Sequence, residues 1–188
     1  MTRIIAGRAG GRPLATPKGS ATRPTTDRVR EAMFSRLDSL VDFEHSRVLD
    51  LYAGSGALGL EAASRGAPEV VCVESDKPTA RLIQRNAMAL DLEHVIVRGE
   101  RVERLLRQGP GASAYDLVLA DPPYPLDEDA ISTVLTLLVT QEWLRPDAVV
   151  MLERSSRSPL PKWPGGLEPL RSKAYGETTV HDALCRPD

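Results

Sequence analysis

The chain has 188 residues, of which 41% are hydrophobic and 27% charged. This length fits one domain of roughly 150 residues with a small extension, and the composition excludes wholesale disorder. No apolar run approaches the roughly 18 residues of a membrane span, and the N-terminus lacks the apolar stretch of a secretion signal. Two cysteines cannot build a disulfide framework, and no Cys/His cluster has zinc spacing. We therefore expect a soluble, cytoplasmic protein that binds neither a metal nor a membrane.

The net charge of −2 conceals a basic N-terminal end. Residues 1–30 hold seven basic side chains and one acidic side chain, that of Asp27, so the rest of the chain carries a net charge of −8. A basic arm on an acidic body is expected of a protein that binds a polyanion. A solubilising tail would have the same composition.

The predicted elements begin with two short β-capable runs, 3–6 and 12–16, which flank Ala9-Gly10-Gly11 and predict a hairpin. After a loop over 18–26, apolar spacing predicts a helix over 28–40. From residue 46 onward, strands and helices alternate. The expected strands are 47–51, 69–73, 94–97, 115–120 and 148–152, and the expected helices are 57–65, 78–90, 102–108 and 129–139. Because these strands are continuous Val and Leu runs, we expect a parallel sheet buried on both faces, followed by a hairpin over 172–186.

The first strand of this series runs directly into a glycine-rich turn that precedes a helix. Gly54, Gly56 and Gly59 form a GxGxxG pattern in the strand–turn–helix context of a nucleotide-binding fold, where glycines let a ligand approach the backbone. Asp50 precedes the turn by four residues, and Glu74 ends the second strand, where an acid can accept hydrogen bonds from ribose hydroxyls.

The acid that precedes the glycines separates two classes of ligand. A carboxylate repels the pyrophosphate of a dinucleotide, whereas it suits the cationic amino group of S-adenosylmethionine. We therefore expect S-adenosylmethionine as the cofactor, with Tyr52 either lining its entrance or packing in the fold. The expected cofactor-binding residues of the turn and the strand ends are Asp50, Tyr52, Gly54, Gly56, Glu74, Ser75 and Asp121.

The sequence Asp121-Pro122-Pro123-Tyr124 ends the fourth strand of the series, at the edge of the sheet where ligands bind. An acidic acceptor and a proline carbonyl can together hold both protons of an exocyclic amino group, and two prolines fix the backbone that presents them. Tyr124 offers a flat face on which a base can stack. A proline-rich loop with an aromatic lid is the structural alternative.

The glycine turn combined with Asp121–Tyr124 resembles class I methyltransferases that modify exocyclic amino groups of bases. The segment Arg23–Phe34, RPTTDRVREAMF, narrows this resemblance to the RsmD family of bacterial 16S ribosomal RNA guanine-N2 methyltransferases. Ile4–Gly7, Gly10–Arg12 and Lys173–Thr178 are also similar to that family, so the resemblance covers essentially the whole chain. It implies an α/β class I S-adenosylmethionine-dependent methyltransferase: a Rossmann-like seven-stranded sheet with an antiparallel last strand and a small N-terminal β-hairpin extension.

The resemblance also implies the activity and its residues. A monomer would methylate the exocyclic N2 of a guanine in 16S ribosomal RNA, within a 30S subunit or an assembly intermediate. Asp121, Pro122, Pro123 and Tyr124 would be catalytic. Glu100 would replace the Asp that this enzyme class commonly places near the cofactor adenine, with the main-chain amide of Arg101 beside it.

Residues 1–26 would form a basic RNA-binding arm, and residues 27–188 would form the methyltransferase domain. We expect the arm to bind RNA rather than to build the fold, because its basic side chains have a single acid nearby. The expected RNA-binding residues are Arg3, Arg8, Arg12, Lys18, Arg23, Thr25 and Arg28.

Three other functions share parts of this pattern. A DNA or RNA adenine-N6 or cytosine-N4 methyltransferase has the same cofactor and the same Asp121–Tyr124 motif, but the chain lacks a domain-sized insert for reading duplex sequence. An NAD-linked oxidoreductase accounts for Glu74 and leaves Asp121–Tyr124 without a role. A non-catalytic RNA-binding module requires only the basic arm.

Overall fold

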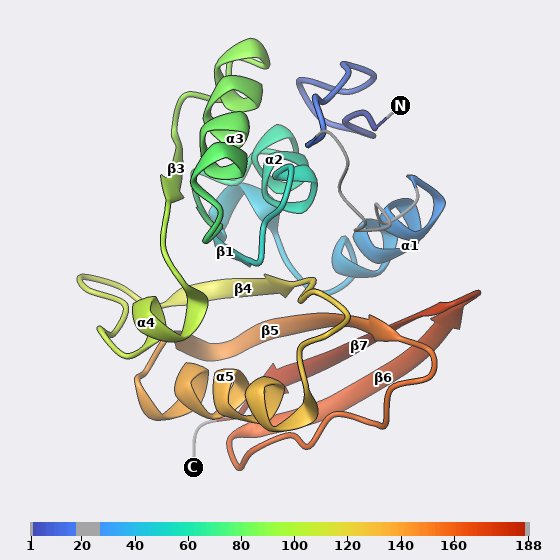
Figure 1. Ribbon diagram of the computed structural model, residues 1–188, viewed down its shortest axis with the longest axis vertical. Helices are drawn as coiled ribbons and strands as arrows, with labels where there is room; N and C mark the ends of the chain where they lie inside the picture. The colour runs from blue at the N-terminus through green and yellow to red at the C-terminus, as the bar shows by residue number, and fades with distance from the viewer. Residues whose placement is uncertain (1, 18–26, 187–188) are drawn as a thin grey trace.

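The computed structural model describes residues 2–17 and 27–186, and seven strands within these ranges form one sheet in the order β3-β2-β1-β4-β5-β7-β6 (Figure 1). The last strand of the chain, β7, is antiparallel to both of its neighbours. The parallel strands are β1 (Arg47–Leu51), β2 (Glu69–Val73), β3 (Val95–Arg98), β4 (Tyr115–Ala120) and β5 (Leu144–Ser155), and the C-terminal hairpin is β6 (Leu167–Tyr175) and β7 (Thr178–Cys185). The expected α/β fold with an antiparallel last strand is confirmed.

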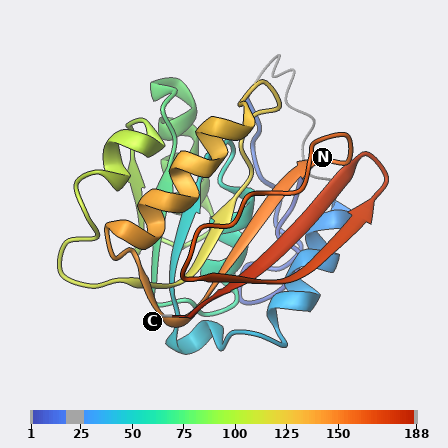
Figure 2. The ribbon, with the colours of Figure 1, turned by 90° about the horizontal axis from the view of Figure 1, so that it is seen from below.

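Helices cover both faces of this sheet. Side chains of successive strand residues point to opposite faces, so Val48 packs in one core cluster and Leu49 in the other. One cluster lies under α1 (Asp27–Leu37), α2 (Ala57–Ser64) and α3 (Lys77–Ala89), and the other lies under α4 (Val102–Leu106) and α5 (Glu128–Thr140). Figure 2 shows α5 in front of the strands and α1 behind the C-terminal hairpin. Burial on both faces explains the continuous apolar strands of the sequence.

Several element boundaries differ from the sequence-based expectation, and three of the differences have a clear local reason. Strand β5 extends to Ser155 because its antiparallel pairing with β7 continues to Thr178. Helix α5 begins at Glu128 because the carboxylate of Asp127 caps it, accepting the amide N–H of Ala130 at 2.8 Å. Helix α1 ends at Leu37, and Leu40 lies in the turn that follows.

The N-terminal segment, residues 2–17, packs onto the domain. The predicted hairpin reduces to a single antiparallel bridge between Arg3 and Pro13, while Ile4, Ala9 and Leu14 belong to the buried cluster under α1 to α3. At Gly7, which has a φ of +77°, a Cβ atom would lie 2.0 Å from the backbone oxygen of Ser64 in α2. The expectation that the arm does not build the fold is therefore wrong, because its apolar side chains fill part of the core.

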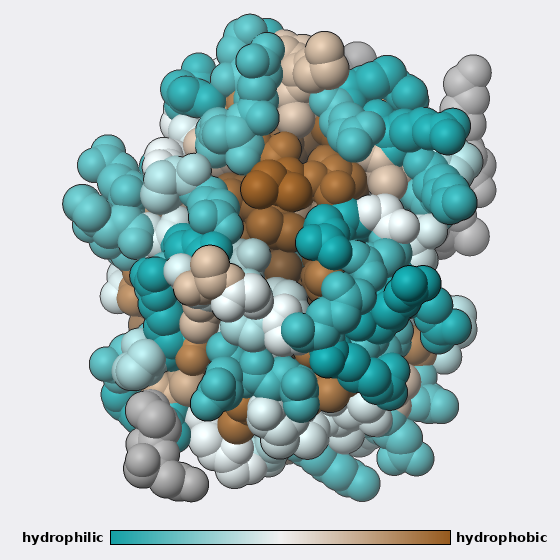
Figure 3. Space-filling model, turned by 90° about the vertical axis from the view of Figure 1, so that its left-hand side faces the viewer, coloured by the Kyte–Doolittle hydropathy of each residue, from teal (hydrophilic) through white to brown (hydrophobic). Residues whose placement is uncertain are grey.

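The two edges of the sheet present different surfaces. Strand β6 is solvent-exposed along most of its length, because it is an edge strand whose only neighbour in the sheet is β7. At the opposite edge, Ile96 of β3 is 49% exposed, and Figure 3 shows hydrophobic residues gathered in the middle of this side, surrounded by hydrophilic ones. None of the helices in the described part of the chain is long and apolar enough to cross a membrane.

Candidate active site

A cavity of about 560 Å³ opens at the carboxyl ends of the central parallel strands. This is the position at which open α/β sheets bind ligands. The structure brings nine of the sequence-predicted residues together in its wall: Asp50, Tyr52, Gly54, Glu74, Ser75, Asp121, Pro122, Pro123 and Tyr124. The glycine turn and the Asp121–Tyr124 segment therefore face one common space.

Asp50 lies at the base of the cavity and is 1% exposed. Its Oδ2 accepts the amide N–H of Gly59 at 2.8 Å, whereas its Oδ1 has no partner among the described residues. A Cβ atom at position 59 would lie 2.9 Å from Oδ2, so the third glycine of the turn permits this approach. Burial raises the pKa of Asp50 to about 7, and the charges of Asp121 and Glu74 act in the same direction.

Glu74 follows β2 and holds the glycine turn in place. Its Oε2 accepts the amide N–H of Gly54 at 3.0 Å, and its Oε1 accepts that of Asp76 at 2.8 Å. One carboxylate thus joins the turn after β1 to the loop after β2. The Cα of Gly54 faces open space, so a ligand can lie directly against this backbone.

The segment after β4 forms the facing part of the wall. The amide of Asp121 donates to the carbonyl of Leu51 at 3.4 Å, which continues the pairing of β4 with β1. Pro122 is buried, and the carbonyl of Pro123 accepts the amide N–H of Leu126 at 2.9 Å, which closes the loop. Tyr124 is 50% exposed, so its ring borders the cavity with a face available to a ligand.

Tyr52 both packs in the fold and lines the cavity. Its side chain packs against the cluster under α4 and α5, where its hydroxyl donates to Glu103 at 3.4 Å, and it also lines the cavity. Burial and the neighbouring Glu103 carboxylate raise the pKa of Tyr52 above its ordinary value. The residue has a φ of +59°, a backbone conformation that few side chains adopt.

The comparisons with known proteins identify the family. A family model described as Conserved hypothetical protein 95 matches residues 2–183. Ribosomal RNA small subunit methyltransferase D of Haemophilus influenzae is 38% identical over 162 residues, which cover 84% of this chain and 81% of that protein. The protein of the same name from Escherichia coli K12 is 32% identical over 176 residues, which cover 93% and 85%. The chain belongs to the family of ribosomal RNA small subunit methyltransferase D. It is a ribosomal RNA methyltransferase that depends on S-adenosylmethionine, as the motifs predicted.

Solved structures agree with this assignment at the level of the fold. Hypothetical protein TTHA0928 of Thermus thermophilus is 29% identical to this chain and superposes with a TM-score of 0.82. The match covers 100% of both chains. The 16S rRNA N2 G1207 methyltransferase of Thermus thermophilus, solved in complex with AdoMet and guanosine, is 24% identical with a TM-score of 0.68, over 90% of this chain and 45% of that chain. The chain therefore shares its fold with the first structure over its whole length and with the second over 90% of its length.

Three predicted cofactor residues lie outside the cavity wall. Both oxygens of Glu100 are engaged elsewhere: Oε1 accepts from Arg98 at 2.7 Å, and Oε2 accepts from Gln108 at 3.1 Å. Arg101 precedes α4 with a side chain that is 79% exposed, and Gly56 is buried beneath the turn. The contact of Glu100 and of the main-chain amide of Arg101 with the adenine therefore stays a prediction, and in this structure Arg98 and Gln108 hold the Glu100 carboxylate.

The predicted RNA-binding residues also divide into groups. Arg12 contacts the end of α3, donating to Asp91 at 2.8 Å and to the carbonyl of Ala89, and Arg8 donates to the carbonyl of Asp91 at 2.8 Å. The expectation that these bases lack partners in the chain is wrong for Arg8 and Arg12. Arg3 and Arg28 are exposed, whereas Lys18, Arg23 and Thr25 lie outside the described residues.

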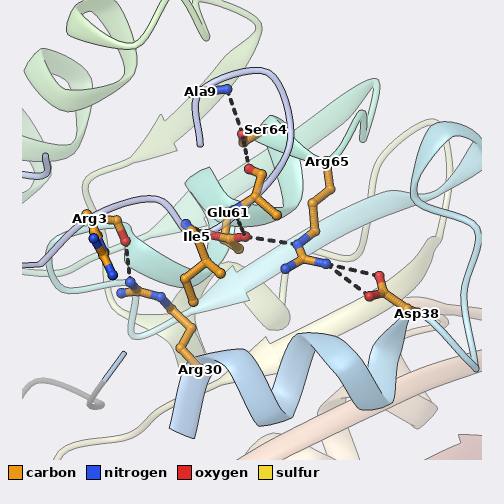
Figure 4. A network of polar contacts seen from close by, with 9 residues as sticks. Arg3, Ile5, Ala9, Arg30, Asp38, Glu61, Ser64 and Arg65 are labelled. Carbon is orange, nitrogen blue, oxygen red and sulfur yellow. Dashed lines mark hydrogen bonds and ion pairs between the residues drawn. The ribbon is translucent and has the colours of Figure 1, made fainter. Parts of the chain in front are cut away.

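A buried carboxylate on α2 anchors the N-terminal segment (Figure 4). Glu61 accepts the amide N–H groups of Ile5 and Ala6 at 2.7 and 3.0 Å, together with Nε of Arg65 at 2.9 Å. One turn further along α2, the hydroxyl of Ser64 accepts the amide of Ala9. Unpaired backbone groups would be costly here, so Glu61 compensates for burying a segment that forms almost no sheet.

Sequence reasoning missed several residues of the cavity wall. The docked N-terminal segment contributes Thr2, Thr16 and Pro17, α1 contributes Arg30, and β5 contributes Glu153. Arg30 is one of the seven basic residues counted in 1–30, yet it is completely buried. The sequence held one signal of this burial. Arg30 lies three residues after Asp27 on α1, a spacing that lets the two side chains pair, and α1 has a buried apolar face.

Proposed function

We propose that this methyltransferase acts on the exocyclic N2 of a guanine in 16S ribosomal RNA, as a monomer, on a 30S subunit or an assembly intermediate. The observation that carries the proposal is the common cavity of the glycine turn and the Asp121–Tyr124 segment. A protein with the same fold, the Thermus thermophilus N2 methyltransferase described above, carries out this type of chemistry on guanine.

The cavity fits the cofactor in shape and in charge. Open space at Gly54 gives access to the backbone, and Glu74 lies where an acid can accept from ribose hydroxyls. Asp50 has a buried oxygen without a partner among the described residues, which suits a cationic group. S-adenosylmethionine, when bound, supplies an electrophilic methyl group on a positively charged sulfur.

The acceptor base is held by the segment after β4. The carboxylate of Asp121 and the carbonyl of Pro122 accept the two N–H groups of the amine, which orients its lone pair away from the ring and toward the methyl donor. Tyr124 stacks on the base and fixes its plane. Alignment and preorganised acceptors account for most of the rate acceleration. Asp121, or water beside it, takes the proton that the amine releases after transfer.

Exposed bases of the N-terminal region would position the RNA backbone. Arg3 and Arg28 are solvent-facing, and Arg12 keeps a side chain that is 43% exposed beside its ion pair with Asp91. We assign phosphate contacts to these three residues and to Arg8, with Lys18, Arg23 and Thr25, which lie outside the described residues, as further candidates. Phosphate contacts of this kind set affinity and make it depend on salt.

Mass spectrometry of digested 16S RNA tests the proposed atom. We expect the purified protein to add N2-methylguanosine to 30S subunits from cells that lack this activity. N6-methyladenosine or N4-methylcytidine would contradict the guanine assignment. Naked 16S RNA and deoxyoligonucleotides serve as alternative substrates in the same assay. Asp129→Asn, a change on the exposed face of α5, is the control variant that should keep full activity.

A further inference from the structure

Arg30 is a charged side chain in the cavity wall whose hydrogen-bonding capacity is only partly used. It is 0% exposed. Its Nη2 donates to the carbonyl of Arg3 and to Asp27 at 3.0 Å. Its Nε and Nη1 have no partner among the described residues. A guanidinium remains charged in a protein, and buried polar groups almost always have partners, so the unused donors point to a ligand.

The anchoring of Arg30 fixes where its charge lies. The contact with Arg3 ties α1 to the N-terminal segment (Figure 4). Thr2, Thr16 and Pro17 of that segment share the cavity wall with Arg30. Burial lowers the pKa of Arg30, whereas Asp27 and Glu61 raise it. The cation is therefore held in a low-dielectric position, in which pairing with an anion is strong.

The charges around the cavity indicate what kind of anion can bind. Among the described residues of the wall, Arg30 is the single base, whereas Asp50, Glu74, Asp121 and Glu153 are acids. A ligand that is purely anionic, such as an RNA phosphate, would be repelled by these four carboxylates. A ligand with one negative and two positive charges matches the wall. S-adenosylmethionine has this pattern: one carboxylate, one ammonium group and one sulfonium.

We propose that Arg30 binds the carboxylate of the methionine end of S-adenosylmethionine and thereby selects cofactors with an intact amino-acid group. The proposal rests on the proposed function for the identity of the ligand. It assigns opposite ends of the amino-acid group to two buried residues, the carboxylate to Arg30 and the ammonium group to Asp50. Selectivity then arises because a cofactor without its carboxylate leaves the buried Nε and Nη1 donors of Arg30 without an acceptor.

The test compares S-adenosylmethionine with decarboxylated S-adenosylmethionine by calorimetric titration. For the unaltered protein we expect at least a tenfold preference for the carboxylated form. Arg30→Met should remove most of this preference by weakening S-adenosylmethionine binding, with little change for the decarboxylated form. Equal affinities for the two compounds in the unaltered protein, or an unchanged preference in Arg30→Met, would overturn the proposal.

Matched variants separate this role from the structural role of Arg30. Arg36→Met removes another arginine of α1, one that pairs with Asp182 at 3.1 Å away from the cavity, and should keep the full preference. Arg30→Lys, which retains the charge, should keep part of the preference for the carboxylated cofactor. It gives a second measurement if Arg30→Met does not fold. An equal loss of preference in Arg36→Met would contradict direct contact.

A binding experiment with RNA tests the alternative that Arg30 binds an RNA phosphate instead of the cofactor carboxylate. Binding of a 16S RNA fragment to Arg30→Met should match that of the unaltered protein when no cofactor is present. A fall in RNA affinity with an intact cofactor preference would assign Arg30 to a phosphate and overturn the carboxylate contact. Methylation of RNA by the unaltered protein is scored separately, so failure of the proposed function and failure of this inference give different results.

Discussion

The two walls of the cavity are assembled in different ways. The wall at the ends of β1 and β2 is local in sequence, and its carboxylates hold neighbouring backbone amides: Asp50 holds Gly59, and Glu74 holds Gly54. The facing wall combines segments that are far apart in the chain, namely residues 2–17, α1 and Asp121–Tyr124. The first wall forms with the sheet itself, whereas the second depends on docking of the N-terminal segment. Variants of the two walls should therefore fail in different ways.

The largest effect is expected at Asp121, on the acceptor side. Asp121→Ala should lower the rate of methyl transfer at least a hundredfold, because it removes a charge-assisted hydrogen bond of about 1.5–3 kcal/mol and the alignment that depends on it. Affinity for S-adenosylmethionine should change less than about threefold, since the wall that holds the cofactor is intact. Single-turnover kinetics and calorimetric titration measure the two quantities.

Asp129→Asn provides the control, because it removes an acid of the same chain region that lies outside the cavity wall. A rate for Asp121→Ala above about one tenth of normal would show that this carboxylate does not grip the amine. A comparable loss in both variants would indicate a general effect on the protein rather than a role in the acceptor site.

Docking of the N-terminal segment can be tested at Glu61. Glu61→Ala leaves the buried amides of Ile5 and Ala6 and the guanidinium of Arg65 without their acceptor. We expect a loss of about 3 kcal/mol in the free energy of unfolding, as for other broken buried ion pairs. Chemical denaturation measures it, and Glu93→Ala, at an exposed acid, is the control. Equal stability of the two variants would mean that the segment does not depend on Glu61.

The local wall could be predicted from sequence, whereas the docked wall could not. Glycine spacing and apolar strands specify the turn after β1 and the acid after β2, because those interactions join residues close in the chain or in neighbouring strands. The position of residues 2–17 depends in part on a buried carboxylate on a helix, Glu61, and a buried Glu in a helical pattern has no signature of its own. Charge counting then suggested that Arg8 and Arg12 were unpaired, since their partners lie at the distant end of α3.

Glu100 illustrates a second limit. Its place after β3 was correct in sequence, yet the side-chain direction is set by Arg98 and Gln108, which hold both carboxylate oxygens. Which of several neighbouring side chains reaches a ligand depends on such competition among hydrogen bonds. A motif defines the loop that carries a residue and leaves its orientation open.

Tyr124 should show an intermediate effect that depends on the ring rather than on the hydroxyl. Tyr124→Ala should lower kcat/KM for methylation of the RNA about tenfold, since stacking on an aromatic ring is worth roughly 1–3 kcal/mol per base. Tyr124→Phe keeps the half-exposed face and should stay within about twofold of normal. The ratio kcat/KM on 30S subunits measures both variants. If Phe is as damaging as Ala, the hydroxyl takes part in the reaction and the stacking role is wrong.

The most specific effect is the pH dependence that Asp50 should impose. Burial raises the pKa of Asp50 to about 7, whereas the same group in an unfolded chain titrates near 3.9. Folding therefore takes up a proton between about pH 4 and 7, so stability falls as the pH rises through this window and levels off above it.

A cation at Asp50 favours the carboxylate, so affinity for S-adenosylmethionine should rise with pH up to about 7 and then level off. Asp50→Asn should remove both dependences, because an amide does not titrate. Titrations from pH 5.5 to 8 in buffers of different ionisation enthalpy measure the affinity and the proton released together. A flat affinity profile, or the same profile in Asp50→Asn, would place the cationic group of the cofactor away from the local wall and leave Asp50 with its backbone contact to Gly59 alone.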